Sequence, residues 1–264
     1  MPERASVTRF DNAIVRRPAP SVVEGLRAVD SGAPDFRGVV AEHEAYVAAL
    51  REAGLAVEVL DALDAFPDAV FVEDPALVFG EGAILLRPGA PSRLGEADHL
   101  APVLERRFPR LIRLAEGYTD GGDVLAMPDR VLIGLSARTD EAGSAALVRA
   151  LAELGRRGEV VRTPPGVLHF KSDCAPLDDD TVLSTARLAA SGVFAGYDVV
   201  IVPEGEEPAA NALRVNDRLL VSAKWPRTAD LLAKRGYAVT PLSTTEIARI
   251  DAGLSCMSLR WLAG

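Results

Sequence analysis

The chain of 264 residues contains few of the residues from which disulfide scaffolds are built. It has two cysteines, Cys174 and Cys256, and two cysteines cannot form a disulfide framework. The opening residues, MPERASVTRF, contain no apolar stretch resembling a signal peptide. We therefore expect a cytoplasmic protein in which both cysteines are free thiols.

Metal and nucleotide motifs are also missing. Neither the cysteines nor the three histidines fall at a metal-ligand spacing such as C-x-x-C or H-x-x-x-H. The segment GEGAI at 80–84 lacks the third glycine of a dinucleotide fingerprint and precedes a strand rather than a helix. The sequence therefore predicts no metal and no cofactor.

Positive charge and long apolar runs are both in short supply. Lysine and arginine number 29 against 38 aspartates and glutamates, for a net charge of −9. Nucleic acid and anionic membranes are bound by clustered positive charge, and no apolar run approaches the roughly 18 residues of a membrane span. We expect neither kind of partner.

What the chain does contain is a repeat. Apolar residues make up 48% of it, and strand-length apolar runs alternate with segments of helical period. A strand, helix, strand unit recurs five times, the fourth copy having only a short, glycine-broken connection; the copies cover 13–60, 83–114, 130–163, 181–204 and 218–242. Modules that cannot bury an apolar face alone favour a closed, pseudo-symmetric α/β ring formed by the single domain 1–264. An ordinary α/β sheet with similar units is the alternative.

An arginine recurs just after the first strand in four copies, at Arg93, Arg138, Arg187 and Arg227.

Two side chains in the connections between copies, those of Cys256 and His169, could carry chemistry near neutral pH. Cys256 follows a flexible stretch near the chain end, and a thiolate is a strong nucleophile when its pKa is lowered. A buried cysteine acting as a small hydrophobe is the alternative.

His169 differs from the other two histidines. It lies in the strand-like run GVLHFKSDCAPL, whereas His43 and His99 lie in helical sequence and are expected at the surface. Imidazole can serve as acid or base near pH 7. A histidine held by a backbone carbonyl is the alternative.

Carboxylates cluster in two segments. Asp68, Glu73 and Asp74 lie in the apolar run FPDAVFVEDPALVF, and buried charges need a partner, so this segment requires an internal cation or a cationic ligand. Asp120 and Asp123 flank two glycines in GYTDGGDVLAM, where the glycines permit backbone geometry that other residues resist. A plain turn is the alternative for this second segment.

Six motifs in this order resemble the dimethylarginine dimethylaminohydrolases of the guanidine-modifying pentein superfamily: FPDAVFVEDPAL, RPGAPSR, TDGGDVL, IGLSART, VLHFKSD and IDAGLSCMS. The resemblance covers nearly the whole chain. It implies a five-module α/β propeller and the hydrolysis of Nω-methylated arginine to L-citrulline and an alkylamine. A small-molecule substrate is implied, and a homodimer is one assembly that the sequence allows.

The resemblance also assigns roles to residues. It implies that Cys256 is the nucleophile, that His169 is the proton donor and base, and that Asp120, where many bacterial members have glutamate, orients the histidine. The remaining positions are implied to bind substrate: Asp68, Glu73 and Asp74 around the guanidinium, Arg93 and Arg138 at the α-carboxylate, and the backbones of Leu26 and Ile250 at the amino-acid end. A guanidinium suits carboxylates because its donors form a planar fork.

Two other functions are weighed against this one. An arginine deiminase typically has Leu-Asp after its catalytic histidine, whereas this chain has Phe170 and Lys171, which leaves room for methyl groups. A non-enzymatic binder of cationic amino acids would use the same carboxylates and arginines, but it would need neither Cys256 nor His169.

Overall fold

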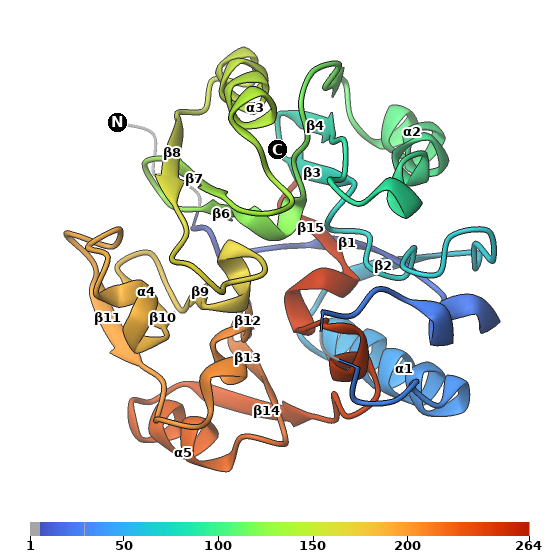
Figure 1. Ribbon diagram of the computed structural model, residues 1–264. Coiled ribbons are helices and arrows are strands. Elements are labelled where there is room, and N and C mark those ends of the chain that lie inside the picture. The colour runs from blue at the N-terminus through green and yellow to red at the C-terminus, as the bar shows by residue number, and fades with distance from the viewer. Residues whose placement is uncertain (1–5, 29, 264) are drawn as a thin grey trace.

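The computed structural model describes residues 6–28 and 30–263. Over these residues it forms five three-stranded sheets arranged in a ring, with the strands toward the centre and the longer helices outside (Figure 1). This is the pentein fold, the five-module propeller that the repeat and the resemblance predicted.

Each sheet has the same plan. A central strand pairs in parallel with the strand that follows its helix and antiparallel with a third, inner strand. The central strands are β1 (Asn12–Arg16), β4 (Gly82–Leu85), β7 (Val131–Leu135), β10 (Thr181–Ser184) and β13 (Arg218–Ser222). The outer strands are β2 (Ala56–Leu60), β5 (Leu111–Arg113), β8 (Gly158–Arg162), β11 (Asp198–Ile201) and β14 (Ala238–Leu242).

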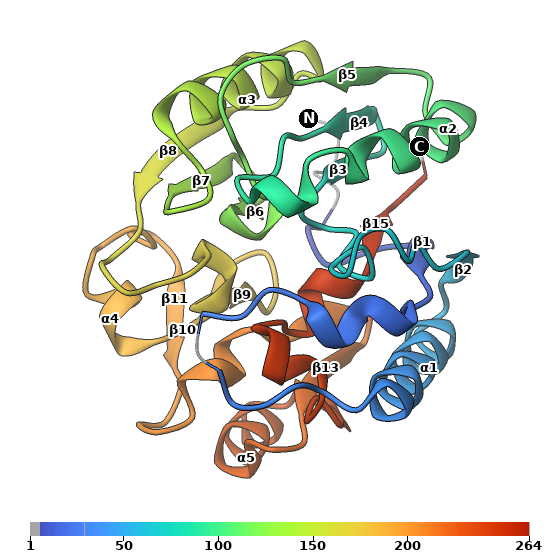
Figure 2. The same cartoon turned by 45° about the vertical axis from the view of Figure 1, so that its right-hand side comes forward.

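The third, inner strands lie outside the strand, helix, strand units that the repeat predicted. They are β15 (Leu259–Trp261), β3 (Ala76–Phe79), β6 (Val124–Ala126), β9 (Cys174–Pro176) and β12 (Leu213–Val215). The inner strand of the first sheet, β15, comes from the C-terminal end of the chain and pairs with β1, Asn12 opposite Trp261 (Figure 2). This pairing closes the ring.

The helices begin and end where local chemistry requires. They are α1 (Phe36–Glu52), α2 (Glu96–Arg107), α3 (Glu141–Glu153), α4 (Ala186–Ala189) and α5 (Pro226–Lys234). The carboxylates of Asp35 and Asp140 cap α1 and α3 by accepting backbone N–H groups of the first turn. The short α4 confirms the degenerate connection predicted for the fourth copy. None of the helices formed by the described residues is long and apolar enough to cross a membrane.

The apolar core is divided among the contacts between neighbouring modules. Ile14 of the first module packs in one cluster with α2 of the second, for example, and Phe79 of the second packs with α3 of the third. No module buries its apolar face alone, which is the property that favoured a ring over an open sheet.

Short 3-10 turns join the modules and position the residues discussed below. They are η1 (Pro20–Glu24), η2 (Pro91–Arg93), η3 (Gly121–Asp123), η4 (Phe170–Ser172), η5 (Glu207–Ala210), η6 (Ile247–Ile250) and η7 (Leu254–Met257).

Candidate active site

Eight of the ten predicted site residues line one small cavity at an end of the ring. They come from six separate connections and are Leu26, Asp68, Asp74, Arg93, Arg138, His169, Ile250 and Cys256. The cavity has a volume of about 40 Å³. Ligand sites usually measure about 300–1,000 Å³, so this cavity is small beside them.

Cys256 lies in η7 and its side chain faces this cavity. The residue is 9% exposed, and its carbonyl oxygen accepts a hydrogen bond from the backbone N–H of Glu73 at 3.2 Å. Burial, together with the charges of Asp74 and Glu73, raises the pKa of the Cys256 thiol to about 12. The thiol is therefore protonated at neutral pH in the free protein.

His169 lies immediately before η4 and is held from two sides. Its Nε2 lies 3.2 Å from Oδ2 of Asp120, and a Cβ at Gly122 would stand 2.5 Å from its Nδ1. Burial lowers the pKa of His169, but the carboxylates of Asp120, Asp74 and Asp123 outweigh it and raise the pKa to about 9. The imidazole is therefore protonated at neutral pH and can donate a proton.

The prediction that His169 lies in a strand is wrong. The backbone N–H of Phe170 donates to the carboxylate of Asp123 at 2.9 Å rather than to a neighbouring strand, and β9 begins only at Cys174. The explanation offered for the glycines in TDGGD is also wrong. Neither has positive φ; both are required because other groups approach closely, the Glu73 carbonyl oxygen standing 1.9 Å from a Cβ built at Gly121.

Asp120 lies behind the histidine, outside the cavity, and is fully buried. Its Oδ1 accepts the backbone N–H of Gly89 at 2.6 Å, and its own N–H donates to the Thr139 hydroxyl at 3.2 Å. Gly89 in turn packs so closely on Arg138 that a Cβ would stand 2.4 Å from the Arg138 carbonyl oxygen. The RPGAPSR motif therefore fixes both the histidine's acidic partner and Arg138.

Arg93 is placed differently from its prediction. Its guanidinium is 5% exposed, pairs with the carboxylate of Asp74, and donates to Glu96 at 2.7 and 2.9 Å. These acids raise its pKa against the lowering effect of burial. The cation is already compensated, so the structure does not support its assignment to a substrate carboxylate.

Arg138 is the free cation of the cavity. Among the described residues its guanidinium has no ion pair and no hydrogen-bond partner, and it is half-buried at the cavity wall. The recurrent arginines thus differ in use, since Arg187 and Arg227 are paired with Asp173 and Glu206.

Negative charge is in excess around Arg93. The carboxylates of Asp68, Asp74 and Glu96 all face Arg93, and the charge of Arg138 also acts on Asp68. Among the described residues, the Asp68 carboxylate accepts one hydrogen bond, from the backbone N–H of Leu26 at 3.0 Å. Burial raises the pKa of Asp68 and raises that of Glu96 to about 6. A cationic ligand would relieve this excess.

Glu73 does not reach the cavity, which corrects the sequence prediction. Its carboxylate faces the opposite side of the chain, where it pairs with Lys171 at 2.7 Å and with Arg260 at 3.1 Å. Asp74 takes one side of the segment and Glu73 the other.

Sequence reasoning missed Asn211 as a residue that joins the two reactive loops. Its side chain accepts the backbone N–H of Ser255 at 3.0 Å and donates to the carbonyl oxygen of Lys171 at 3.1 Å. It therefore ties the loop of Cys256 to the loop of His169. A lone asparagine between modules carries no sequence signal for this role.

His43 is a further correction, because it is buried at 3% exposure and burial lowers its pKa to about 4. It lies on the inner face of α1 with Val39, Tyr46 and Leu50, a helical spacing that could have placed it in the core. His99 is exposed, as predicted.

One group of the described residues could approach a metal ion. Ligand atoms of Asp74, Asp120 and His169 lie within 4.8 Å of one another. However, Asp74 is already paired with Arg93 and accepts the N–H of Gly122. Asp74, Asp120 and His169 are thus already paired with other protein groups.

Comparison with known proteins identifies the family to which the chain belongs. A dimethylarginine dimethylaminohydrolase of Pseudomonas aeruginosa is 37% identical over 254 residues, which cover 96% of this chain and all of that protein. The chain belongs to the dimethylarginine dimethylaminohydrolase family. The family described as "N,N dimethylarginine dimethylhydrolase, eukaryotic" also matches residues 36–155.

Solved structures of the family superpose closely. A cysteine-to-serine variant of the P. aeruginosa enzyme complexed with citrulline has a TM-score of 0.92 and covers 96% of this chain and 99% of its own. A histidine-to-glycine variant described as an adduct with S-methyl-L-thiocitrulline has the same TM-score, 37% identity, and covers 95% and 99%.

Proposed function

We propose that this protein hydrolyses Nω-methylated arginine to L-citrulline and methylamine or dimethylamine. The observation that carries the proposal is the meeting of Cys256 and His169 in a cavity that has excess carboxylate at one place and a free guanidinium at another. A ligand with a cation at one end and a carboxylate at the other satisfies both.

Substrate recognition divides between the two ends of the ligand. The guanidinium of the substrate pairs with Asp68 and Asp74, and its α-carboxylate pairs with Arg138. The carbonyl oxygen of Leu26, which accepts no hydrogen bond from the described residues, is available to the α-ammonium group. Ile250 closes the same end of the cavity.

The chemistry follows from the two perturbed groups. The bound cation lowers the pKa of the Cys256 thiol, and the thiolate formed attacks the guanidinium carbon. Protonated His169 gives its proton to the leaving amine as the carbon–nitrogen bond breaks, which leaves a thiouronium on sulfur. Neutral His169 then takes a proton from a water whose oxygen attacks the same carbon, and citrulline and the thiol are released.

The arginine deiminase alternative places an aspartate two residues after the histidine. Here that residue is Lys171, which is committed to Glu73 on the other side of the chain. With lysine in place of the aspartate, no carboxylate at this position excludes a methylated nitrogen. Turnover of dimethylarginine compared with that of arginine separates the two activities.

A citrulline assay with dimethylarginine, monomethylarginine and arginine tests the proposal. Cys256→Ser should abolish turnover and still bind dimethylarginine in calorimetry, because recognition lies with the carboxylates and Arg138. Absence of citrulline from every compound would refute the proposal. Assembly as a homodimer and location in the cytoplasm stay predictions; light scattering tests the first.

A further inference from the structure

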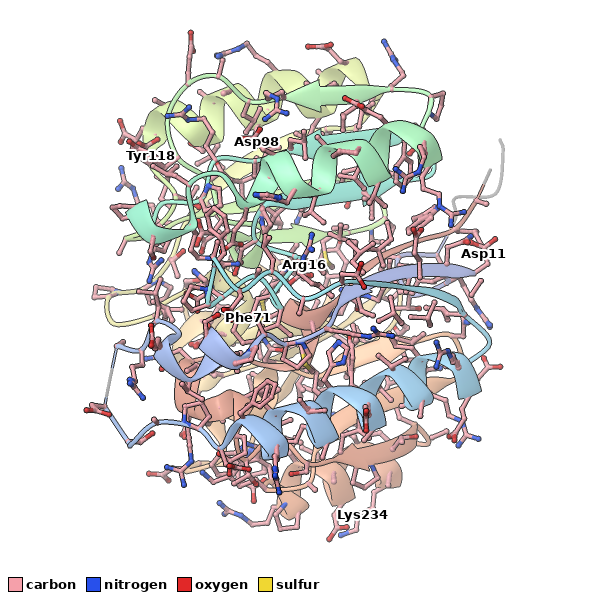
Figure 3. All side chains as sticks on the ribbon, turned by 90° about the vertical axis from the view of Figure 1, so that its right-hand side faces the viewer. Asp11, Arg16, Phe71, Asp98, Tyr118 and Lys234 are labelled. Carbon is pink, nitrogen blue, oxygen red and sulfur yellow. The ribbon has the colours of Figure 1, made fainter. Side chains whose placement is uncertain are left out.

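A second and larger cavity lies along the axis of the ring. It has a volume of about 410 Å³ and is walled by the five inner strands. Ser6, Phe10 and Ala263 lie at its rim. In Figure 3 this end of the molecule, marked by Asp11, lies opposite the end marked by Tyr118, which is two residues from Asp120.

The two cavities share a wall. Glu73 and Ser255 face the second cavity, whereas Asp74 and Cys256, the next residues along the chain, face the first. The proposed reaction uses none of the side chains on the axial side of this wall.

The inner end of the axial cavity carries an uncompensated positive charge. Lys171 and Arg260, each with a side chain 10% exposed, share the single carboxylate of Glu73. Two cations and one anion leave a net charge of +1, and a buried charge without a partner is costly.

Polar atoms here also lack partners. Among the described residues, Nε of Arg260 and the hydroxyl of Ser255 are buried without a hydrogen-bond partner. Farther along the cavity the Nη1 of Arg214 is in the same condition, and no ion pair joins Arg214 to an acid within the part of the chain that the structure describes. Two other arginines of the lining, Arg9 and Arg156, are paired with acids. These cations and hydrogen-bond donors therefore lack an anion that accepts hydrogen bonds.

The walls between these groups are apolar. Leu77, Phe79, Leu213, Leu259 and Trp261 line the cavity. A volume of this size is within the range of small-molecule sites, about 300–1,000 Å³. The occupant that fits both features has one negative end and an apolar body.

We propose that the axial cavity is a second binding site, which takes a small monocarboxylate with an apolar body, its carboxylate at Lys171 and Arg260. One carboxylate neutralises the inner end, and it accepts hydrogen bonds from Nε of Arg260 and from the Ser255 hydroxyl. The hydrocarbon then lies against the inner strands, toward the rim.

Trp261 provides a direct readout. The chain has two tryptophans, and Trp225→Phe leaves Trp261 as the only one. In this background, octanoate should change the emission of Trp261 saturably. Octylamine and octanol, which match its chain but not its charge, should produce no saturable change.

Variants show which of the two cavities binds octanoate. Lys171→Met removes the excess charge and should weaken octanoate binding at least tenfold. Arg157→Gln removes the same charge from a side chain that is 70% exposed and outside the cavity, and should leave binding unchanged. Arg138→Gln, in the first cavity, should also leave it unchanged. If thermal unfolding shows that Lys171→Met does not fold, Lys171→Gln is used in its place.

Three outcomes would overturn the proposal. They are the absence of a saturable response to octanoate, equal responses to octylamine or octanol, and loss of binding in Arg138→Gln, which would place the carboxylate in the first cavity. The measurement follows fluorescence rather than turnover, so it stands whether or not the protein hydrolyses methylarginine.

Discussion

The carboxylate of Asp120 should set the charge state of His169, and Asp120→Asn tests this directly. The Asp120 Oδ2 atom lies 3.2 Å from Nε2 of the imidazole in a fully buried position. An asparagine can keep the hydrogen bond from Gly89 through Oδ1, but its amide N–H group would then face Nε2. That donor favours the neutral imidazole.

The expected magnitude follows from the electrostatics of the site. Removing an opposite charge at this distance should lower the pKa of His169 from about 9 by about 1 to 2 units, since Asp74 and Asp123 remain. The protonated fraction at pH 8 then falls from about nine-tenths to between about one half and one tenth. Turnover of dimethylarginine at pH 8 should fall at least in proportion, because the acid is the imidazolium.

The assay is NMR of ¹³C-labelled histidine across pH 5 to 10. The chain has three histidines, and His169→Gln identifies the signal of interest. Asp61→Asn, at a fully exposed carboxylate, removes the same charge and should leave the titration unchanged. An unaltered pKa of His169 in Asp120→Asn would refute the reasoning.

The same change alters stability with a definite sign. A raised pKa means that protonated His169 stabilises the fold fully below pH 6.5, its unperturbed pKa, and that this contribution is lost as the pH rises through about 9. The thermal midpoint should therefore fall between pH 6.5 and 9 more steeply in the wild-type protein than in Asp120→Asn. Parallel curves would contradict this account.

Three further predictions concern neighbouring residues. Arg138→Gln should raise the KM for dimethylarginine at least tenfold with a smaller change in kcat, measured by citrulline formation; an unchanged KM would remove Arg138 from the α-carboxylate end. Asn211→Ala should lower kcat about tenfold or more through misplaced loops, as the loss of a positioning group does, while Asn211→Asp, which keeps the acceptor for Ser255, should retain more activity; equal loss in both would count against this role. Gly122→Ala should disturb His169, because a Cβ there meets Nδ1 at 2.5 Å, and wild-type turnover by a folded variant would contradict the tight packing.

The five-module ring could be predicted because each central strand, helix and outer strand has its own period. The place of the inner strands in the sheets could not. Four of them have three residues, too few to show alternation, and β15 joins the first sheet from the far end of the chain. Their pairing depends on closure of the ring, which no local pattern records.

The site was predictable where one residue carries the chemistry. Cys256 and His169 fall together in space as the resemblance implied. The direction of Glu73 and the compensation of Arg93 were not, because both depend on tertiary placement. Glu96, which neutralises Arg93 from three residues away, appears in the sequence only as the first residue of a helix.

Arg93 and Arg138 show how one repeated residue acquires two uses in a pseudo-symmetric ring. Both follow the central strand of their modules and line the same cavity, but only Arg93 has buried acids, Asp74 and Glu96, as partners. The first arginine holds the carboxylate of Asp74, at which we propose that the substrate guanidinium binds. The second, without an acid, keeps its charge for an anion. The cation-binding and anion-binding ends that we propose for the cavity thus arise because acidic partners accompany one arginine of the repeat and not the other.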